Sequence, residues 1–161
     1  QLSSQKLWPG VENGPSIAGF SKALELFMEN FNQYRDKMRK LRDILINGIL
    51  DQIDDVFLNG PKGDRRSVDN VNVSFLSCEG EALTVELSLR GVYVSSGSAC
   101  TSRTLEPSHV LLAIGRQYEI AHGSILMKVS PLHSEEDIEY ALSQLVEAVK
   151  RIRSIAPKEV M

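Results

Sequence analysis

The stretch VNVSFLSCEGEALTVELSLRGVYV, residues 71–94, contains the pattern that decides the fold. Its first five residues, VNVSF, alternate between apolar side chains and polar ones, which is typical of a half-buried strand. Residues 79–89 then have the composition of a short helix, and Gly91 stands where a helix commonly ends. Residues 92–94 are a brief β-branched and aromatic run, typical of a strand. The stretch therefore predicts a strand, a helix and a strand in direct succession.

Upstream of this stretch, residues 15–50 are predicted to form one long helix. Apolar side chains recur at alternating spacings of three and four, and Pro15 suits a first helical turn. The helix would be roughly 50 Å long, so part of its apolar stripe is expected to face another domain or another chain. The Arg35–Arg42 cluster is expected on its solvated faces. The stripe consists of Ile17, Phe20, Leu24, Phe27, Phe31, Tyr34, Met38, Leu41 and Leu45.

The last predicted helix, residues 134–153, has the clearest boundaries. Ser134 can cap its first turn, and Asp137 completes a capping box. Its apolar side chains recur at helical spacing and predict one buried face. They are Ile138, Ala141, Leu142, Leu145, Val149 and Ile152.

Shorter elements complete the pattern. Residues 56–58 and 125–129 are predicted strands, and residues 107–114 are a predicted short helix. Short strands interleaved with helices, with a helix at each end, favour an α+β layer. We therefore expect one α+β domain over residues 15–161, with a small, mostly antiparallel sheet covered by helices on one face.

Composition and charge narrow the classes of function. At 161 residues the chain suits one domain with a real core, and its formal net charge of -3 gives no reason to expect nucleic acid or an anionic membrane surface as a partner. No apolar run approaches the roughly 20 residues of a membrane span, and no signal-peptide pattern opens the chain. We expect a cytoplasmic protein without a membrane segment. Because the first residue is Gln1, we also expect an upstream segment that this sequence does not include.

Two cysteines, Cys78 and Cys100, are too few for a disulfide framework. Cys78 is interpreted as a small buried hydrophobic residue. A metal site that combines both cysteines with His109 and His122 lacks any recognised ligand spacing, so no metal is expected.

Cys100 lies in a segment of unusual composition, residues 95–102. Five of these eight residues carry hydroxyl groups and none is bulky, so we expect an exposed, mobile loop. An exposed thiol on a flexible tether suits a nucleophile that collects a group at one site and delivers it at another, and neighbouring Arg103 can favour its thiolate. The residues alone leave open whether Cys100 is such a nucleophile or an incidental surface thiol. The other residues of the loop are Ser95, Ser96, Gly97, Ser98, Ala99, Thr101 and Ser102.

The same segment resembles the active-site loop of NifS/IscS-type cysteine desulfurases. The resemblance rests on VSSGSACTS at residues 94–102, followed by LEPSHVL at residues 105–111. It extends, in the family's order, over nearly the whole chain. The further matching stretches are EN at 12–13, PSIAGF at 15–20, NVSF at 72–75, EGEAL at 79–83 and AHGSI at 121–125.

This resemblance implies the C-terminal small domain of a fold-type-I enzyme that depends on pyridoxal phosphate (PLP). Residues 1–14 would be a remnant of the junction to the cofactor domain, and residues 95–106 the active-cysteine loop. In such enzymes the loop cysteine attacks the sulfur of cofactor-bound L-cysteine, alanine is released, and the resulting persulfide passes its sulfur to an acceptor such as an iron–sulfur scaffold. Cys100 stands at the position of that cysteine. The implied partners are a PLP-binding large domain or chain, a second copy or another chain in a homodimer or heteromer, and a sulfur acceptor protein.

The sequence also departs from the family's pattern. The family's large domain, with its Schiff-base lysine, precedes the region seen here, so no cofactor-binding residue is expected in this chain. WPGV at residues 8–11 replaces an Arg-x-Gly-Thr pattern whose threonine reaches the cofactor phosphate. Leu126 stands where the family has an arginine that binds the substrate carboxylate, and Lys128, two residues on, is a candidate substitute.

Two functions are consistent with these features. In one, the chain is part of an enzyme, and Cys100 carries sulfur once a separate PLP-binding domain joins it. In the other, the chain is a non-catalytic interaction or dimerisation module that has lost desulfurase activity. The intact loop favours the first function, and the missing arginine, threonine and Schiff-base lysine favour the second. We expect no desulfuration of cysteine by this chain alone.

Overall fold

The structure, a computed structural model, describes residues 11–97 and 106–155. It falls into two compact units, residues 1–34 and residues 35–161. Most of the lead-in predicted over residues 1–14 lies outside the described residues, and so does the segment that contains Cys100. None of the described helices is long and apolar enough to cross a membrane.

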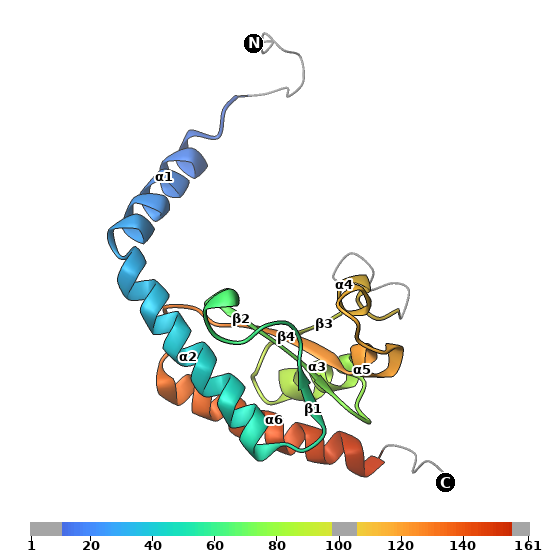
Figure 1. Ribbon diagram of the computed structural model, residues 1–161. Coiled ribbons are helices and arrows are strands. Elements are labelled where there is room, and N and C mark those ends of the chain that lie inside the picture. Colours follow the sequence, from blue (N-terminus) through green and yellow to red (C-terminus); the bar gives the residue numbers. More distant parts are fainter. Residues whose placement is uncertain (1–10, 98–105, 156–161) are drawn as a thin grey trace. The chain divides into compact units, whose positions relative to one another are not determined.

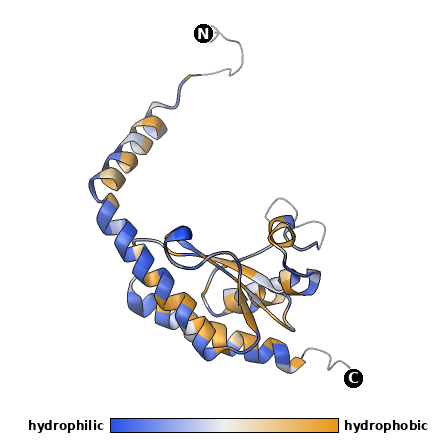
Figure 2. Ribbon diagram, viewed as in Figure 1, coloured by the Kyte–Doolittle hydropathy of each residue, from blue (hydrophilic) through white to orange (hydrophobic). Residues whose placement is uncertain are grey.

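The described part of the first unit contains α1 (Gly14–Glu29). Asn13 Oδ1 accepts a hydrogen bond from Ser16 N at 3.2 Å, and Pro15 stands in the first turn, so this helix begins as its sequence predicts. No residue of α1 is buried, and hydrophobic positions, orange in Figure 2, recur along it. The N-terminal half of the predicted apolar stripe is therefore exposed. The exposed large apolar side chains of α1 are Ile17, Phe20, Leu24, Leu26, Phe27 and Met28.

The helix predicted to be continuous over residues 15–50 is divided at Asn30, after which α2 (Phe31–Gln52) begins. Asn30 has φ -106° and ψ 10°, and its side-chain Nδ2 donates a hydrogen bond to the carbonyl oxygen of Leu26 at 2.8 Å. Asparagine side chains compete for backbone groups in this way, which disfavours a regular helix. The apolar period continues across the break, so periodicity did not indicate it.

A four-stranded antiparallel sheet forms the centre of the second unit, with the strand order β1-β2-β4-β3 (Figure 1). In the pairing of β2 with β4, Val73 lies opposite Ile125, and in the pairing of β3 with β4, Ser95 lies opposite Leu126. The predicted α+β class with a small antiparallel sheet is confirmed. The strands are β1 (Val56–Leu58), β2 (Asn70–Phe75), β3 (Ser95–Ser96) and β4 (Ser124–Lys128).

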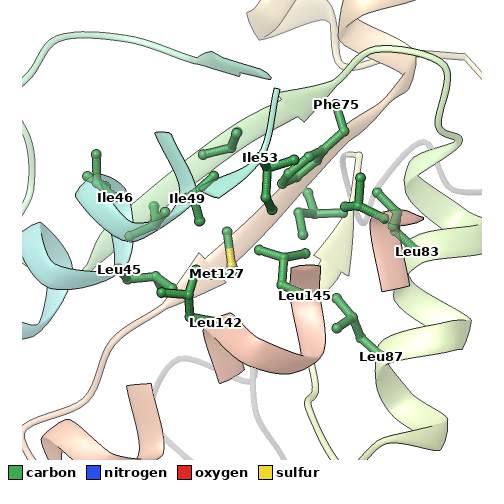
Figure 3. Packing of buried hydrophobic residues seen from close by; sticks show 14 of the residues in the cluster. Leu45, Ile46, Ile49, Ile53, Phe75, Leu83, Leu87, Met127, Leu142 and Leu145 are labelled. Atoms are coloured by element: carbon green, nitrogen blue, oxygen red, sulfur yellow. The ribbon is translucent and has the colours of Figure 1, made fainter. Parts of the chain in front are cut away.

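The helices α2, α3 (Gly80–Leu89) and α6 (Glu135–Ile155) bury one face of this sheet. Figure 3 shows their apolar side chains meeting those of β2 and β4 in a single core. At Gly48, α2 comes so close to α6 that an added Cβ would collide with the side chain of Leu142. Core residues labelled in the figure include Leu45, Ile49, Phe75, Leu83, Leu87, Met127 and Leu145.

The capping box predicted for the last helix is present at the start of α6. Ser134 N donates to Asp137 Oδ2 at 2.8 Å, and Asp137 N donates to Ser134 Oγ at 3.2 Å. These reciprocal bonds satisfy backbone donors that the first turn of a helix leaves unpaired.

Two other short elements differ from the prediction. The strand predicted over residues 92–94 is wrong in position, because the pairing with β4 begins only at Ser95. Between α4 (His109–Ala113) and β4 the chain forms an additional helix, α5 (Tyr118–His122), which was not predicted. Five residues are too few for a helical period to appear in the sequence.

Arg42 corrects the expectation that the arginines of α2 lie on solvated faces. Only 1% of its surface is exposed. Its Nη1 donates to the carbonyl oxygens of Arg66 at 3.0 Å and Ser67 at 3.2 Å, and its Nη2 lies 2.7 Å from Asp43 Oδ1 in an ion pair without hydrogen-bonding geometry. Arg42 thus ties α2 to the segment that precedes β2, which its position on a helical wheel does not indicate.

Candidate functional site

A pocket of about 580 Å³ lies on the face of the sheet opposite the helical core. Side chains alternate along a strand, so Asn72 of β2 and Leu126 of β4 point away from the buried Val73 and Ile125 and line this pocket. The loop between β1 and β2 and the region of α4 supply the other walls. The volume is typical of a site for a small molecule.

The stem of the predicted active-cysteine loop forms part of the pocket wall. Ser95 and Gly97 line the pocket, and Ser96 pairs with Ile125 in the sheet. Gly97 has φ +58°, a left-handed conformation that would strain any residue with a Cβ, so this turn out of β3 favours glycine. The rest of the predicted loop site lies outside the described residues: Ser98, Ala99, Cys100, Thr101, Ser102 and Arg103.

Lys128, the candidate substitute for the family's carboxylate-binding arginine, has a partner elsewhere. Its Nζ lies 2.8 Å from Asp69 Oδ2. Burial tends to raise the pKa of Asp69, but hydrogen bonds from Lys128 and Ser67 outweigh burial and hold that pKa below its ordinary value. Leu126 lines the pocket and Lys128 does not. Lys128 thus stays a sequence-based candidate that lies outside the lining of this pocket.

A polar network centred on Asn59, which is 4% exposed, supports the pocket. Asn59 Nδ2 donates to Asn72 Oδ1 at 2.7 Å and to Ser74 Oγ at 2.8 Å, and Asn59 Oδ1 accepts from Arg116 Nε at 2.8 Å. Sequence reasoning missed this network, because Asn59 and Arg116 lie 57 positions apart and no motif relates them. The available signal was the pair of polar side chains, Asn72 and Ser74, on the outer face of the predicted strand.

Arg66 is the second centre of this network and is 7% exposed. Its Nε donates to Pro61 O at 2.7 Å, its Nη1 donates to Asn70 Oδ1 at 2.8 Å, and its Nη2 donates to Asn59 O. Burial, together with the nearby charge of Arg42, lowers the pKa of Arg66 from its ordinary value. The wall of the pocket therefore contains a buried guanidinium that is held by neutral oxygen atoms.

The comparison with protein families matches the model described as Aminotransferase class-V over residues 2–140. The chain belongs to this family. It is 46% identical over 148 residues to the cysteine desulfurase IscS of Clostridium botulinum (strain Hall), an alignment that covers 91% of this chain and 37% of that protein. It is 40% identical over 148 residues to the cysteine desulfurase IscS 1 of Archaeoglobus fulgidus, with 92% of this chain and 38% of that protein covered. The chain thus spans well under half the length of these relatives.

Solved structures agree with this membership of the class-V aminotransferase family. A NifS-like protein matches with a TM-score of 0.76 and 28% identity, over 92% of this chain and 37% of that one. The NifS-like protein from Rickettsia africae matches with a TM-score of 0.72 and 26% identity, over 94% of this chain and 38% of that one. The predicted resemblance to NifS/IscS-type proteins is confirmed.

Members of the class-V aminotransferase family such as IscS depend on PLP, which such proteins hold through a lysine side chain and a partner for the ring nitrogen. The residues that line the pocket include no lysine, aspartate or glutamate. The lining of this pocket therefore does not by itself fit PLP. Within residues 11–97 and 106–155, no three His, Cys, Asp or Glu side chains come together as a metal ion would require.

Cys78, which follows β2, is buried in the core as its sequence context predicts. Burial raises the pKa of the Cys78 thiol, while the charge of Arg153 and a hydrogen bond to it act in the opposite direction. The thiolate is the reactive form of cysteine, so a buried thiol with a raised pKa reacts slowly.

The Cys100→Ser variant, in which Cys78 is the remaining thiol, provides a test of this burial. We expect folded Cys100→Ser protein to react with iodoacetamide at least about tenfold more slowly than the same variant unfolded in urea. Mass spectrometry of quenched time points measures both rates. Equal rates in the two states would contradict the buried position of Cys78.

Proposed function

We propose that this chain is the sulfur-carrying small domain of a cysteine desulfurase, with Cys100 as the residue that accepts sulfur as a persulfide. The observation that carries the proposal is the position of the loop stem: Ser95 and Gly97 line the pocket, and Cys100 follows Gly97 by three positions. Three residues of extended chain span at most about 11 Å. The proposal therefore places the thiol within reach of a ligand in the pocket.

The chemistry requires only a thiolate and a sulfur donor. The Cys100 sulfur attacks the terminal sulfur of a persulfide R–S–SH, and a bond forms between these two atoms. The S–S bond of the donor breaks, the donor leaves as the thiolate R–S⁻, and the transferred sulfur keeps its proton. Atoms and electrons balance without an external oxidant or reductant.

Desulfuration of L-cysteine itself would need PLP, and the lining of the pocket does not fit that cofactor. We propose that a PLP-bearing domain or chain provides it, and that the sulfur passes to an acceptor protein for iron–sulfur cluster assembly. The exposed apolar side chains of α1 offer a surface for such a domain or for a second copy of the chain. A cytoplasmic location would suit the proposal, because a sulfur-carrying thiol has to return to its reduced form.

The first test is an intact-mass measurement after exposure of the purified chain to an alkyl persulfide whose alkyl group carries no charged substituent. We expect wild type and Cys78→Ser to gain one sulfur atom that dithiothreitol removes. The Cys100→Ser variant should gain none while it is folded. An absence of gain in wild type, or an equal gain in Cys100→Ser, would contradict the proposal.

A non-catalytic interaction module is the second candidate. The observation that favours it is Leu126, which presents an aliphatic side chain to the pocket at the position of the family's carboxylate-binding arginine. An aliphatic group cannot replace charge-assisted hydrogen bonds to a carboxylate. This candidate predicts no sulfur gain at Cys100 in the mass measurement, so the same experiment separates the two functions.

A further inference from the structure

The pocket has an unbalanced charge. Two arginines, Arg65 and Arg66, are among the residues that line it, and none of the lining residues is acidic. Removing charge from water is costly unless an opposite charge or hydrogen bonds compensate it. A pocket of this kind favours an anionic ligand over a neutral or cationic one.

Arg66 cannot turn toward a ligand without losing its present contacts. Its Nε, Nη1 and Nη2 each donate to a protein oxygen, and those three oxygens are neutral. The guanidinium is therefore fixed in place, and no carboxylate of the described residues forms an ion pair with it. Its contribution to a ligand is a positive potential at the wall of the pocket.

The neighbouring acids are engaged by other basic residues. Asp64 lies 3.5 Å from Arg39 in an ion pair, and Asp69 lies 2.8 Å from Lys128. These two carboxylates are the acids nearest in sequence to Arg65 and Arg66. Neither pairs with the arginines of the pocket in the described part of the chain.

Arg65 is free to contact a ligand, unlike Arg66. It is exposed, lies at the end of the short 3-10 helix η1 (Gly63–Arg65), and forms no hydrogen bond or ion pair with any of the described residues. A guanidinium in this position can bind a carboxylate through two parallel N–H···O bonds. Polar side chains of Asn72 and Ser95 lie in the same lining.

The rest of the lining is aliphatic. Leu126 of β4 and Val110, Leu111 and Ile114 of the α4 region face the same space as the arginines. A hydrated ion such as inorganic phosphate gains nothing from such a surface, whereas a short hydrocarbon group loses contact with water there. The combination suits a small organic anion with one charged end and one apolar end.

We propose that this pocket binds a small carboxylate with a short apolar side chain, and that Arg65 is the residue that contacts the carboxylate. Arg65, in the loop before β2, would then bind the carboxylate in this pocket. The aliphatic side chain of Leu126 in β4 cannot form those hydrogen bonds. The link between this ligand and the sulfur donor of Cys100 rests on the proposed function, but binding of the carboxylate does not.

Propionate is a suitable probe, and propionamide is its uncharged match. We expect the backbone amide signals of Asn72, Ser95 and Leu126 in ¹H–¹⁵N spectra of the full chain to shift saturably with propionate and not with propionamide. In Arg65→Gln, the dissociation constant for propionate should rise about tenfold, because charge-assisted hydrogen bonds are lost. Inorganic phosphate at the same concentration should compete poorly.

Lys62→Gln is the matched control. It removes one positive charge from the same exposed loop, but Lys62 is not part of the pocket lining, and we expect its effect on the dissociation constant to stay below about twofold. Equal weakening by Lys62→Gln and Arg65→Gln would overturn the role of Arg65, since it would reflect only the net charge of the loop. Equal binding of propionamide, or tighter binding of phosphate, would overturn the assignment of a carboxylate ligand.

The mass measurement separates this proposal from the proposed function. With an alkyl persulfide that carries no carboxylate as donor, Arg65→Gln should gain sulfur at Cys100 as wild type does. Loss of propionate binding together with intact sulfur gain would support Arg65 as a ligand-binding residue distinct from the sulfur acceptor. If propionate binds and Cys100 gains no sulfur, the pocket assignment stands and the sulfur-carrying function fails.

Discussion

The Arg66→Met variant is expected to lose about 3 kcal/mol of unfolding free energy. Methionine fills a similar volume but donates no hydrogen bond, so the oxygens of Pro61, Asn70 and Asn59 that now accept from Arg66 would lose their partner. Each buried polar group left unsatisfied costs about 1–3 kcal/mol, and only part of this cost is recovered if water enters through the pocket. Urea unfolding followed by circular dichroism measures the change.

Arg65→Met is the matched control for this prediction. It makes the same chemical change at the adjacent position, where the side chain is exposed and without a partner among the described residues. Surface substitutions of this kind change stability by about 0.5 kcal/mol or less. If the two variants unfold at the same urea concentration, the hydrogen bonds of Arg66 do not stabilise the fold.

The second large effect is expected at Gly123, the residue before β4. An added Cβ would collide with the carbonyl oxygen of Phe75 and lie 2.7 Å from that of Cys78. Both obstacles are backbone atoms, and the Gly123 carbonyl accepts a hydrogen bond from Phe75 N at 3.0 Å, so β2 and β4 would have to move apart. We expect Gly123→Ala to lose about 2–3 kcal/mol of unfolding free energy, the upper part of the range for overpacked sites.

Gly19→Ala provides the control for the added methyl group. Gly19 lies in the exposed helix α1 with no atom within 4 Å of the position of an added Cβ. Alanine favours a helix over glycine by about 1 kcal/mol, so this variant should not unfold more readily than wild type. Thermal unfolding of both variants, monitored by circular dichroism, compares them. A stability of Gly123→Ala equal to that of wild type would contradict the close approach of β2 and β4.

The sequence predicted a helix or strand well wherever the segment has a regular apolar period or a local cap. The alternation of Val71, Val73 and Phe75 predicts the strand β2, and the Ser134–Asp137 pair marks the start of α6. Both signals involve residues a few positions apart, and their physical causes act over the same short range.

The predicted boundaries of helices and strands were less accurate where a contact, and not a periodic pattern, sets the boundary. The first residue of β3 is Ser95 and not Val92, because Ser95 is the first residue that pairs with β4. Residues 92–96 have no apolar period that would indicate this boundary. The break falls at Asn30, whose side chain bonds to the Leu26 carbonyl, and the apolar stripe passes over this position unchanged.

In the candidate site, too, the sequence identifies one part and not the other. The composition of residues 95–102 and the resemblance of that segment to the NifS/IscS loop identify Cys100 as the candidate nucleophile. The pocket beside the loop stem was not predictable, because its walls come from β2, β4, the loop between β1 and β2, and the α4 region. No spacing in the sequence relates these segments.

By itself, therefore, the sequence determined the α+β class, the family and the identity of the sulfur-accepting candidate, because periodic burial, capping and a contiguous motif are local properties of the chain. Only the tertiary structure decided that Arg42 and Arg66 are buried, that Asn59 bonds to Arg116 across 57 positions, and that Arg65 and Leu126 line one pocket. The physical reason is that a buried polar group must find a partner wherever the fold provides one, and that partner can come from any part of the chain.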